Sequence, residues 1–150
     1  MLDKLNYTIF TLMNIGKLPG SGTIASLFTV FFYYLVIYFF SQIIFFSIFL
    51  IVVTYSFFFL KKILKIFNNK DPKEIVIDEF IGQSIPLLMC DGNITLIIIS
   101  FLAFRVFDIF KIFPANIFDK KIDGPIGIIG DDIIAGLYTL LIIYFIKTYI

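Results

Sequence analysis

The sequence predicts an all-α integral membrane protein, a bundle of about four to five transmembrane helices with a short N-terminal interfacial segment. Hydrophobic residues make up 60% of the 150 residues, whereas soluble domains are nearer half apolar. Two runs, 24–40 and 43–60, contain no charged residue, and each is about long enough to cross a ~30 Å hydrocarbon core. We therefore expect residues 1–150 to form a single multi-pass membrane domain.

The composition excludes several classes of function. The net charge of +1 gives no argument for nucleic-acid binding. Histidine is absent, which removes Ser-His-Asp and Cys-His catalysis.

The single cysteine, Cys90, cannot form an intrachain disulfide. The opening stretch, MLDKLNYTIF, has no long apolar run before a cleavage site, so we expect no signal peptide.

The first 60 residues predict a lead-in, a loop and a helical hairpin. Apolar residues recur at helical spacing in residues 1–22, and this segment could lie in the membrane interface or form an ordinary amphipathic lead-in. The Gly- and Pro-rich stretch 16–23 comes next and is a predicted loop. Ser41 and Gln42 separate the two uncharged runs, so these runs are expected to pair as an antiparallel helical hairpin.

The second half predicts three more helices. Asp71-Pro72-Lys73-Glu74 has the N-cap, first-turn proline and third-position acid of a helix start, which predicts a helix from Asp71 to about Met89. Because Pro86 interrupts it, this helix could be a short span or a re-entrant segment. A fourth helix is expected over 94–110, after the turn Asp91-Gly92-Asn93. Prolines and glycines predict a loop over 111–130, followed by a fifth helix from about Asp131 toward Ile150.

The positive charges predict the orientation in the membrane. If the N-terminus is cytoplasmic and five helices cross, eleven of the twelve Lys and Arg residues lie on the cytoplasmic side and only Lys147 lies opposite. The same threading places every acidic residue except Asp91 on the cytoplasmic side. We therefore expect the functional groups to gather at one face of the membrane, the cytoplasmic one.

Five carboxylates lie where the apolar segments meet polar loops. They are Asp78, Glu79, Asp108, Asp131 and Asp132. An aspartate at the centre of a spanning helix costs roughly 2.5–3.5 kcal/mol, so five such acids indicate a functional site. Several carboxylates without histidine favour a hard cation such as Mg²⁺, whose shell is completed by water and substrate phosphate.

A small residue follows three of these acids one helical turn later. Gly82 follows Asp78 by four residues, Ala135 follows Asp131 by four, and Gly136 follows Asp132 by four. Small residues let a second helix approach closely, which predicts two helices packed with their acids side by side. The alternative is that acids near helix N-termini only cap the helix or complement its dipole. That alternative fits Asp131 better than Asp78, which lies well inside its predicted helix.

Two further patterns predict contacts with an anion. Arg105, Asp108 and Lys111 form a polar stripe at the end of an apolar helix. It is either an internal salt bridge with a snorkelling lysine, or a site in which Asp108 binds a metal and the two cations bind an anionic substrate. The 16–23 loop precedes a helix, whose N-terminal N–H groups suit a phosphate, although an interfacial turn would explain it too. The phosphate contacts expected there are Gly20, Ser21, Gly22 and Thr23.

Four blocks of the sequence, in this order, resemble the phosphatidylglycerophosphatase A family. They are LPGSGTIASL (18–27), IVIDEFIGQ (75–83), FRVFDIFKIFP (104–114) and GIIGDDIIAG (127–136). The resemblance implies a small multi-pass enzyme of the bacterial inner membrane that removes the terminal phosphate of phosphatidylglycerophosphate in a Mg²⁺-dependent step. The sequence departs from the family at Ile112, where proline is usual, and at Gly130, where a larger residue is common.

We therefore expect a cytoplasm-facing phosphatase whose partners are the lipid bilayer and an anionic phospholipid substrate. The expected catalytic residues are Asp78, Glu79, Asp131 and Asp132. The expected metal ligands are Asp78, Asp108, Asp131 and Asp132. Arg105 and Lys111 are expected to bind the phosphate together with the 16–23 loop. The competing class is a cation-coupled transporter, which would place its carboxylates near mid-membrane. The sequence leaves the oligomeric state open.

Overall fold

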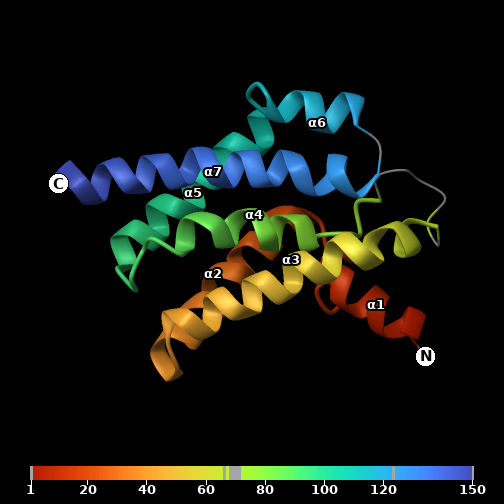
Figure 1. The fold of residues 1–150 in the computed structure, drawn as a ribbon, viewed down its shortest axis with the longest axis horizontal. Coiled ribbons are helices and arrows are strands. Elements are labelled where there is room, and N and C mark those ends of the chain that lie inside the picture. The colour runs from red at the N-terminus through yellow and green to blue at the C-terminus, as the bar shows by residue number, and fades with distance from the viewer. Residues whose placement is uncertain (1, 66, 68–71, 123, 150) are drawn as a thin grey trace.

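The computed structural model of the chain describes residues 2–65, 67, 72–122 and 124–149. All regular secondary structure within these residues is helical (Figure 1). The elements are α1 (Leu2–Phe10), a short 3-10 turn η1 (Ile15–Lys17), α2 (Ser21–Phe39), α3 (Gln42–Leu64), α4 (Ile77–Leu87), α5 (Ile94–Phe110), α6 (Ala115–Lys121) and α7 (Pro125–Tyr149). The all-α class is therefore confirmed.

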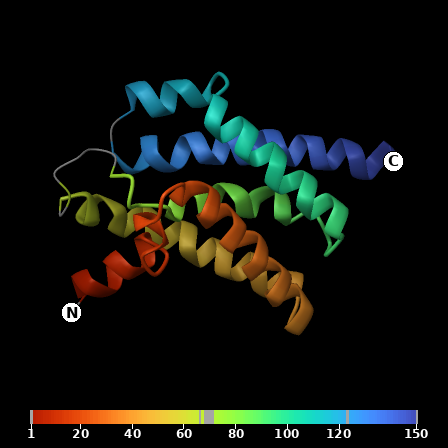
Figure 2. The same ribbon diagram turned by 180° about the vertical axis from the view of Figure 1, so that it is seen from behind.

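Two helical hairpins and one long helix run between the two ends of the molecule. Ser41 begins α3, and its hydroxyl oxygen accepts a hydrogen bond from the Ile44 N–H at 3.4 Å. Asn93 begins α5 in the same way, because its Oδ1 accepts from the N–H groups of Thr95 and Leu96. Both hairpin turns lie toward the end that carries the C-terminus, whereas α1 and the beginning of α7 lie toward the other end (Figures 1 and 2).

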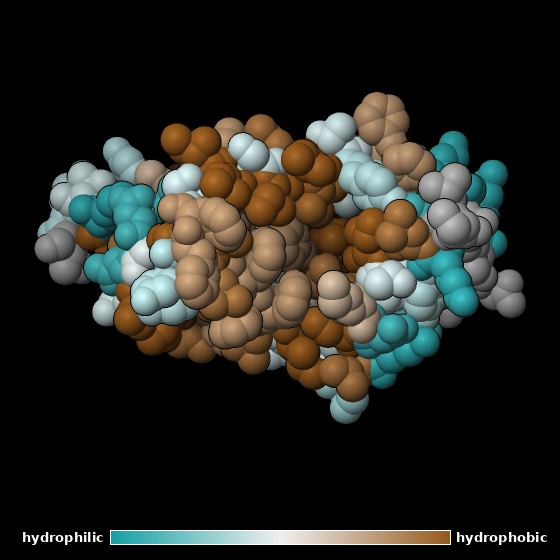
Figure 3. Space-filling model, turned by 90° about the horizontal axis from the view of Figure 1, so that it is seen from below, coloured by the Kyte–Doolittle hydropathy of each residue, from teal (hydrophilic) through white to brown (hydrophobic). Residues whose placement is uncertain are grey.

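Among the described residues, three helices are long and apolar enough to cross a membrane: α2, α3 and α7. At 1.5 Å per residue, the 17 residues of α5 span about 26 Å and the 11 residues of α4 only about 16 Å. The face drawn in Figure 3 is apolar along its middle and hydrophilic toward both ends, as a spanning protein requires. Three candidate spans are thus confirmed, and the count of four to five stays a prediction.

The N-terminal segment has one buried and one exposed side. In α1 the side chains of Asn6 and Phe10 are buried, whereas Leu5 is exposed. The Phe10 carbonyl also accepts a hydrogen bond from the Val76 N–H at 3.0 Å. The segment therefore packs on the body of the protein and is amphipathic, as the sequence predicts, while its place in the interface stays a prediction.

The predicted start of the third helix is wrong. Asp71 itself lies outside the described residues, and α4 begins only at Ile77. The reason is that the preceding backbone packs against the N-terminal segment instead of coiling. A Cβ added to Gly16 would lie 1.8 Å from the Glu74 carbonyl oxygen. As a consequence Asp78 lies in the first turn of α4, where it complements the helix dipole.

The prediction of a loop over 111–130 is also wrong. Within this stretch Ala115–Lys121 form α6, and α7 starts at Pro125 rather than near Asp131. The glycines in this stretch serve close packing. A Cβ on Gly127 would lie 1.8 Å from the Ile122 carbonyl oxygen, and one on Gly130 would lie 2.3 Å from the Phe118 ring. Asp131 therefore lies inside α7 and does not cap it.

The short helix α4 is the centre of the bundle, in contact with α2, α3, α5 and α7. Its side chains Ile81 and Leu87 are fully buried. Each belongs to a different apolar cluster, the first around Phe10 and Leu60 and the second around Tyr33 and other residues of the hairpins. Packing on every side of α4 fixes the position of its first turn, which carries the acids.

Candidate active site

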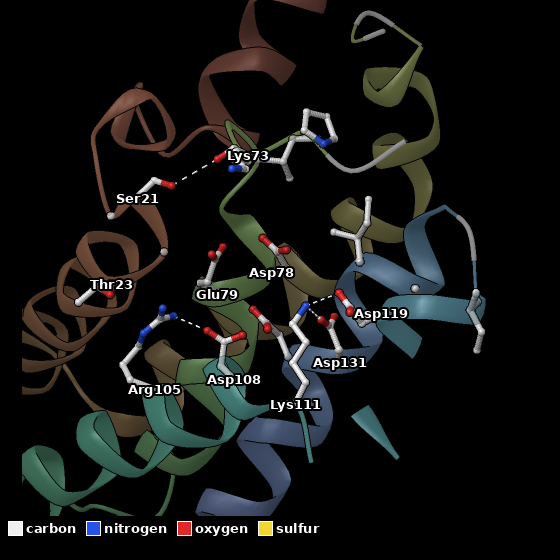
Figure 4. Close-up of a pocket in the computed structure, with 18 of the residues that line it drawn as sticks. Ser21, Thr23, Lys73, Asp78, Glu79, Arg105, Asp108, Lys111, Asp119 and Asp131 are labelled. Carbon is white, nitrogen blue, oxygen red and sulfur yellow. Dashed lines mark hydrogen bonds and ion pairs between the residues drawn. The ribbon is translucent and has the colours of Figure 1, made fainter. Parts of the chain in front are cut away.

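A cavity of about 490 Å³ opens where the N-terminus of α2, the first turn of α4, the end of α5 and the beginning of α7 meet (Figure 4). Every residue for which the sequence predicts a catalytic, metal or phosphate role lines this cavity. These residues are Gly20, Ser21, Gly22, Thr23, Asp78, Glu79, Arg105, Asp108, Lys111, Asp131 and Asp132. Four helices and one loop thus bring together residues that are more than a hundred positions apart in the chain.

Three carboxylates form one cluster. Asp78 and Glu79 come from the first turn of α4, and Asp132 comes from the second turn of α7. One oxygen from each lies within 4.8 Å of the others. Glu79 Oε2 and Asp132 Oδ2 are buried and have no hydrogen-bond partner among the described residues. Because buried, unpaired carboxylate oxygens are costly, this donor set fits a bound hard cation.

Arg105 and Asp108 form the second group, on the last turns of α5. Their side chains are ion-paired at 2.5 Å, with exposures of 15% and 13%. The Arg105 guanidinium also donates to the Ser26 hydroxyl at 3.4 Å. The internal salt bridge that the sequence allows is therefore present, and it lies on the cavity wall, where the guanidinium can also reach an anion.

Lys111 forms the third group, with two carboxylates. It ends α5 in a left-handed conformation with φ 43°. Its ammonium donates to Asp131 Oδ2 at 2.8 Å and to Asp119 on α6. Burial lowers the pKa of Lys111, but hydrogen bonds and charge interactions with Asp119 and Asp131 outweigh burial and raise the pKa above its usual range. Lys111 is therefore a permanent cation in the cavity.

The glycine-rich stretch forms the fourth wall. Gly20 takes a left-handed conformation (φ 69°) immediately before α2, and Ser21 donates to the Lys73 carbonyl oxygen at 3.3 Å. A Cβ on Gly22 would lie 2.4 Å from Glu79 Oε1. The absence of a side chain at Gly22 thus lets the N-terminus of α2, with its unpaired N–H groups, face the acids and accommodate an anion.

Sequence reasoning missed two side chains of this cavity, Asp119 and Lys73, and a third, Ser26, that contacts the site. The sequence does not indicate a role for Asp119, because the segment that contains it is predicted to be a loop. Lys73 was assigned only to a helix start. Ser26 is fully buried and binds both the Gly22 carbonyl oxygen and Arg105. The only sequence feature that indicates a role for Ser26 is its position inside the 18–27 block, which resembles the family.

The fold and the site define a class: an all-helical protein with candidate membrane spans and, at one end, a cavity that combines clustered carboxylates with an arginine and a lysine. Comparison with protein families identifies the family within this class. The family model of phosphatidylglycerophosphatase A matches residues 8–147, so the chain belongs to this family.

Curated relatives agree with this membership. A phosphatidylglycerophosphatase A of Escherichia coli is 40% identical over 77 residues, which cover 51% of this chain and 45% of the relative. One from Haemophilus influenzae is 37% identical over 78 residues, 51% of this chain and 48% of the relative. A putative phosphatidylinositol-3-phosphatase of Bacteroides thetaiotaomicron is 36% identical over 80 residues, 49% of this chain and 48% of the relative. The matched region thus spans about half the length of each relative. No solved structure matches the chain.

Proposed function

We propose that the protein is a Mg²⁺-dependent lipid phosphatase that hydrolyses phosphatidylglycerophosphate to phosphatidylglycerol and inorganic phosphate. The observation that carries the proposal is the single cavity in which a carboxylate cluster, Arg105 and Lys111 meet at one end of apolar helices. The acids suit a hard cation and the two basic side chains suit a phosphate. Membership of the family and the similarity to the two relatives named phosphatidylglycerophosphatase A support the choice of substrate.

The metal would be held first by Asp78, Glu79 and Asp132, whose oxygens already lie together. Asp108 and Asp131 are proposed as further ligands, although each is paired with a basic side chain in this structure. A bound Mg²⁺ would neutralise the phosphoryl group and orient a water molecule. Because Glu79 Oε2 has no partner among the described residues, this second oxygen of Glu79 could instead serve as the base that accepts the proton of the attacking water.

The phosphoryl group would be bound by positive groups on three sides. Arg105 and Lys111 would neutralise its charge as the transition state forms. The N–H groups at residues 20–23 would contact its oxygens. Hydrolysis forms a bond from the water oxygen to phosphorus and breaks the bond from phosphorus to the glycerol oxygen. The glycerol oxygen leaves with a proton, so phosphatidylglycerol and phosphate are the products.

The geometry also supports the proposed place in the cell. The acids lie in the first turn of α4, near the end of α5 and early in α7, so a lipid headgroup would meet them while its acyl chains stay beside the apolar helices. The positive-inside bias of the sequence favours the cytoplasmic side for these acids, and we propose the bacterial inner membrane as the location. A cation-coupled transporter would need acids near mid-membrane. The acids of this site instead lie near the N-terminal ends of α4 and α7, which does not match that requirement.

The test is phosphate release from phosphatidylglycerophosphate in detergent micelles by the purified protein. We expect release with Mg²⁺, loss of release with a chelator, and a rate at least about 100-fold lower in Asp78→Asn and Asp131→Asn. Asp91→Asn is the control, because Asp91 is an aspartate of the opposite end, paired with Lys147. No release by the folded wild-type protein would contradict the function. Unchanged release in both site variants would contradict the site.

A further inference from the structure

Asp119 on α6 is a side chain of the cavity that the proposed chemistry does not yet use. It lines the cavity wall and accepts a hydrogen bond from the Lys111 ammonium. Asp131 accepts from the same ammonium at 2.8 Å. Figure 4 shows the Lys111 ammonium bound to both carboxylates, which lie on the same side of it; the Asp131 side chain is 8% exposed and the Asp119 side chain 27%. Lys111 is therefore shared between an inner and an outer carboxylate.

The pair with Asp119 contributes little as a salt bridge alone. The side chains of Lys111 and Asp119 are 31% and 27% exposed, and partly exposed pairs add little to stability. Lysine, however, has a long flexible stem that must be held in one geometry if it is to serve as a ligand. Two carboxylates use two of the three ammonium N–H bonds and leave one for a further acceptor.

The position of Asp119 is fixed by the packing of α6 on α7. Its neighbour Phe118 contacts Gly130 so closely that a Cβ there would lie 2.3 Å from the ring. Gly127 likewise contacts the Ile122 carbonyl oxygen at the end of α6. The two glycines of α7 thus hold α6 against the site, and α6 presents Asp119 to Lys111.

We propose that Asp119 is a positioning residue for phosphate binding: together with Asp131, it holds the Lys111 ammonium so that its third N–H points to the phosphoryl group. This inference rests on the proposed function, in which Lys111 binds phosphate. Asp119 does not itself touch the substrate. A neutral residue at this position leaves Lys111 with one carboxylate, so the ammonium is drawn to Asp131 and away from the phosphate.

The test compares Asp119→Asn, Asp119→Glu and the control Asp91→Asn. Asp91 also forms a partly exposed pair with a lysine, at the opposite end of the molecule. We expect Asp119→Asn to raise the KM for phosphatidylglycerophosphate and the inhibition constant of inorganic phosphate by about tenfold, with a smaller change in kcat and an unchanged melting temperature. Asp119→Glu should restore most of the affinity, and Asp91→Asn should change neither constant.

A double variant separates positioning from an independent role. In a Lys111→Gln background, Asp119→Asn should cause no further loss, because the residue through which it acts is gone. An equal tenfold loss in that background would overturn the proposal, as would unchanged constants in Asp119→Asn alone. If Lys111→Gln releases no measurable phosphate, the single variants decide. If the wild type releases none, the proposed function fails, and calorimetric binding of inorganic phosphate to the same variants still tests the role of Asp119.

Discussion

Gly82 on α4 and Gly136 on α7 touch backbone to backbone: a Cβ added to Gly136 would lie 2.4 Å from the Gly82 carbonyl oxygen. One turn before these glycines lie Asp78 and Asp132. The close approach of the two helices therefore sets the distance between the carboxylates of the site. This contact confirms the prediction that small residues one turn after the acids let two helices pack with their acids side by side.

The first prediction concerns this contact. Gly136→Ala places a methyl group against a backbone atom that cannot rotate away, so the helices must separate. We expect a loss of about 1–3 kcal/mol of stability and a higher Mg²⁺ concentration for half-maximal phosphate release. Thermal unfolding in detergent and a Mg²⁺ titration measure the two effects. The control is Leu137→Ala, at an exposed neighbouring position. Normal stability and Mg²⁺ dependence in Gly136→Ala would show that the glycine contact does not set the site.

The second prediction concerns Arg105, which pairs with Asp108 and also reaches Ser26. A lysine has no planar fork and cannot make both contacts. We expect Arg105→Gln to lower kcat/KM by about 100-fold, and Arg105→Lys to recover only a small part. Steady-state kinetics checks this against Lys17→Gln, which removes an exposed cation that lies over the Tyr7 ring. Full activity in Arg105→Lys would show that only charge matters here.

The sequence predicts the long apolar helices well because their signal is composition and length. The runs 24–40 and 43–60 correspond to α2 and α3, and 94–110 is α5 with the same bounds. The start of α4 could not be predicted, because the strong local helix signal at Pro72–Glu74 is overridden by a distant contact with Gly16. Local propensity is a weak prior where the chain packs against another segment.

The sequence predicts which residues belong to the site, but it does not predict all of the ion pairs that they form with one another. Acids, cations and the glycine-rich loop each carry a local pattern, and all of them line one cavity. One partner of Lys111, Asp119, lies on α6. The glycines in 111–130 favour a loop by composition, so the sequence does not predict this helix. Gly127 and Gly130 permit helix packing rather than a turn, and single-sequence patterns do not distinguish these two uses of glycine.

The third prediction concerns Cys90, which is fully buried and donates to the Pro86 carbonyl oxygen at 3.4 Å. Burial raises the pKa of its thiol from 9.0 to about 12. Because the unfolded thiol ionises first, stability is unaffected below about pH 9 and falls as the pH rises from 9 toward 12. At pH 8 we expect iodoacetamide to modify the folded protein at least about 100-fold more slowly than the denatured protein. Equal rates would show that Cys90 is accessible.

The fourth prediction concerns orientation. In a Cys90→Ser background, Phe40→Cys places a thiol at the α2–α3 turn, and Lys61→Cys places one near the end of α3. Positive-inside orientation predicts that a membrane-impermeant maleimide labels Phe40→Cys in intact spheroplasts and labels Lys61→Cys only after permeabilisation. The reverse pattern would place the cavity on the opposite face of the membrane.

The central claim is that the carboxylate cluster of α4 and α7 binds the Mg²⁺ needed for phosphate release. Its most direct test is a Mg²⁺ titration of release from phosphatidylglycerophosphate by the wild type, Asp132→Asn and the control Asp91→Asn. We predict saturable Mg²⁺ dependence for the wild type and the control, and a rate at least about 100-fold lower for Asp132→Asn at every Mg²⁺ concentration. Release by Asp132→Asn that matches the wild type across the titration would contradict the claim.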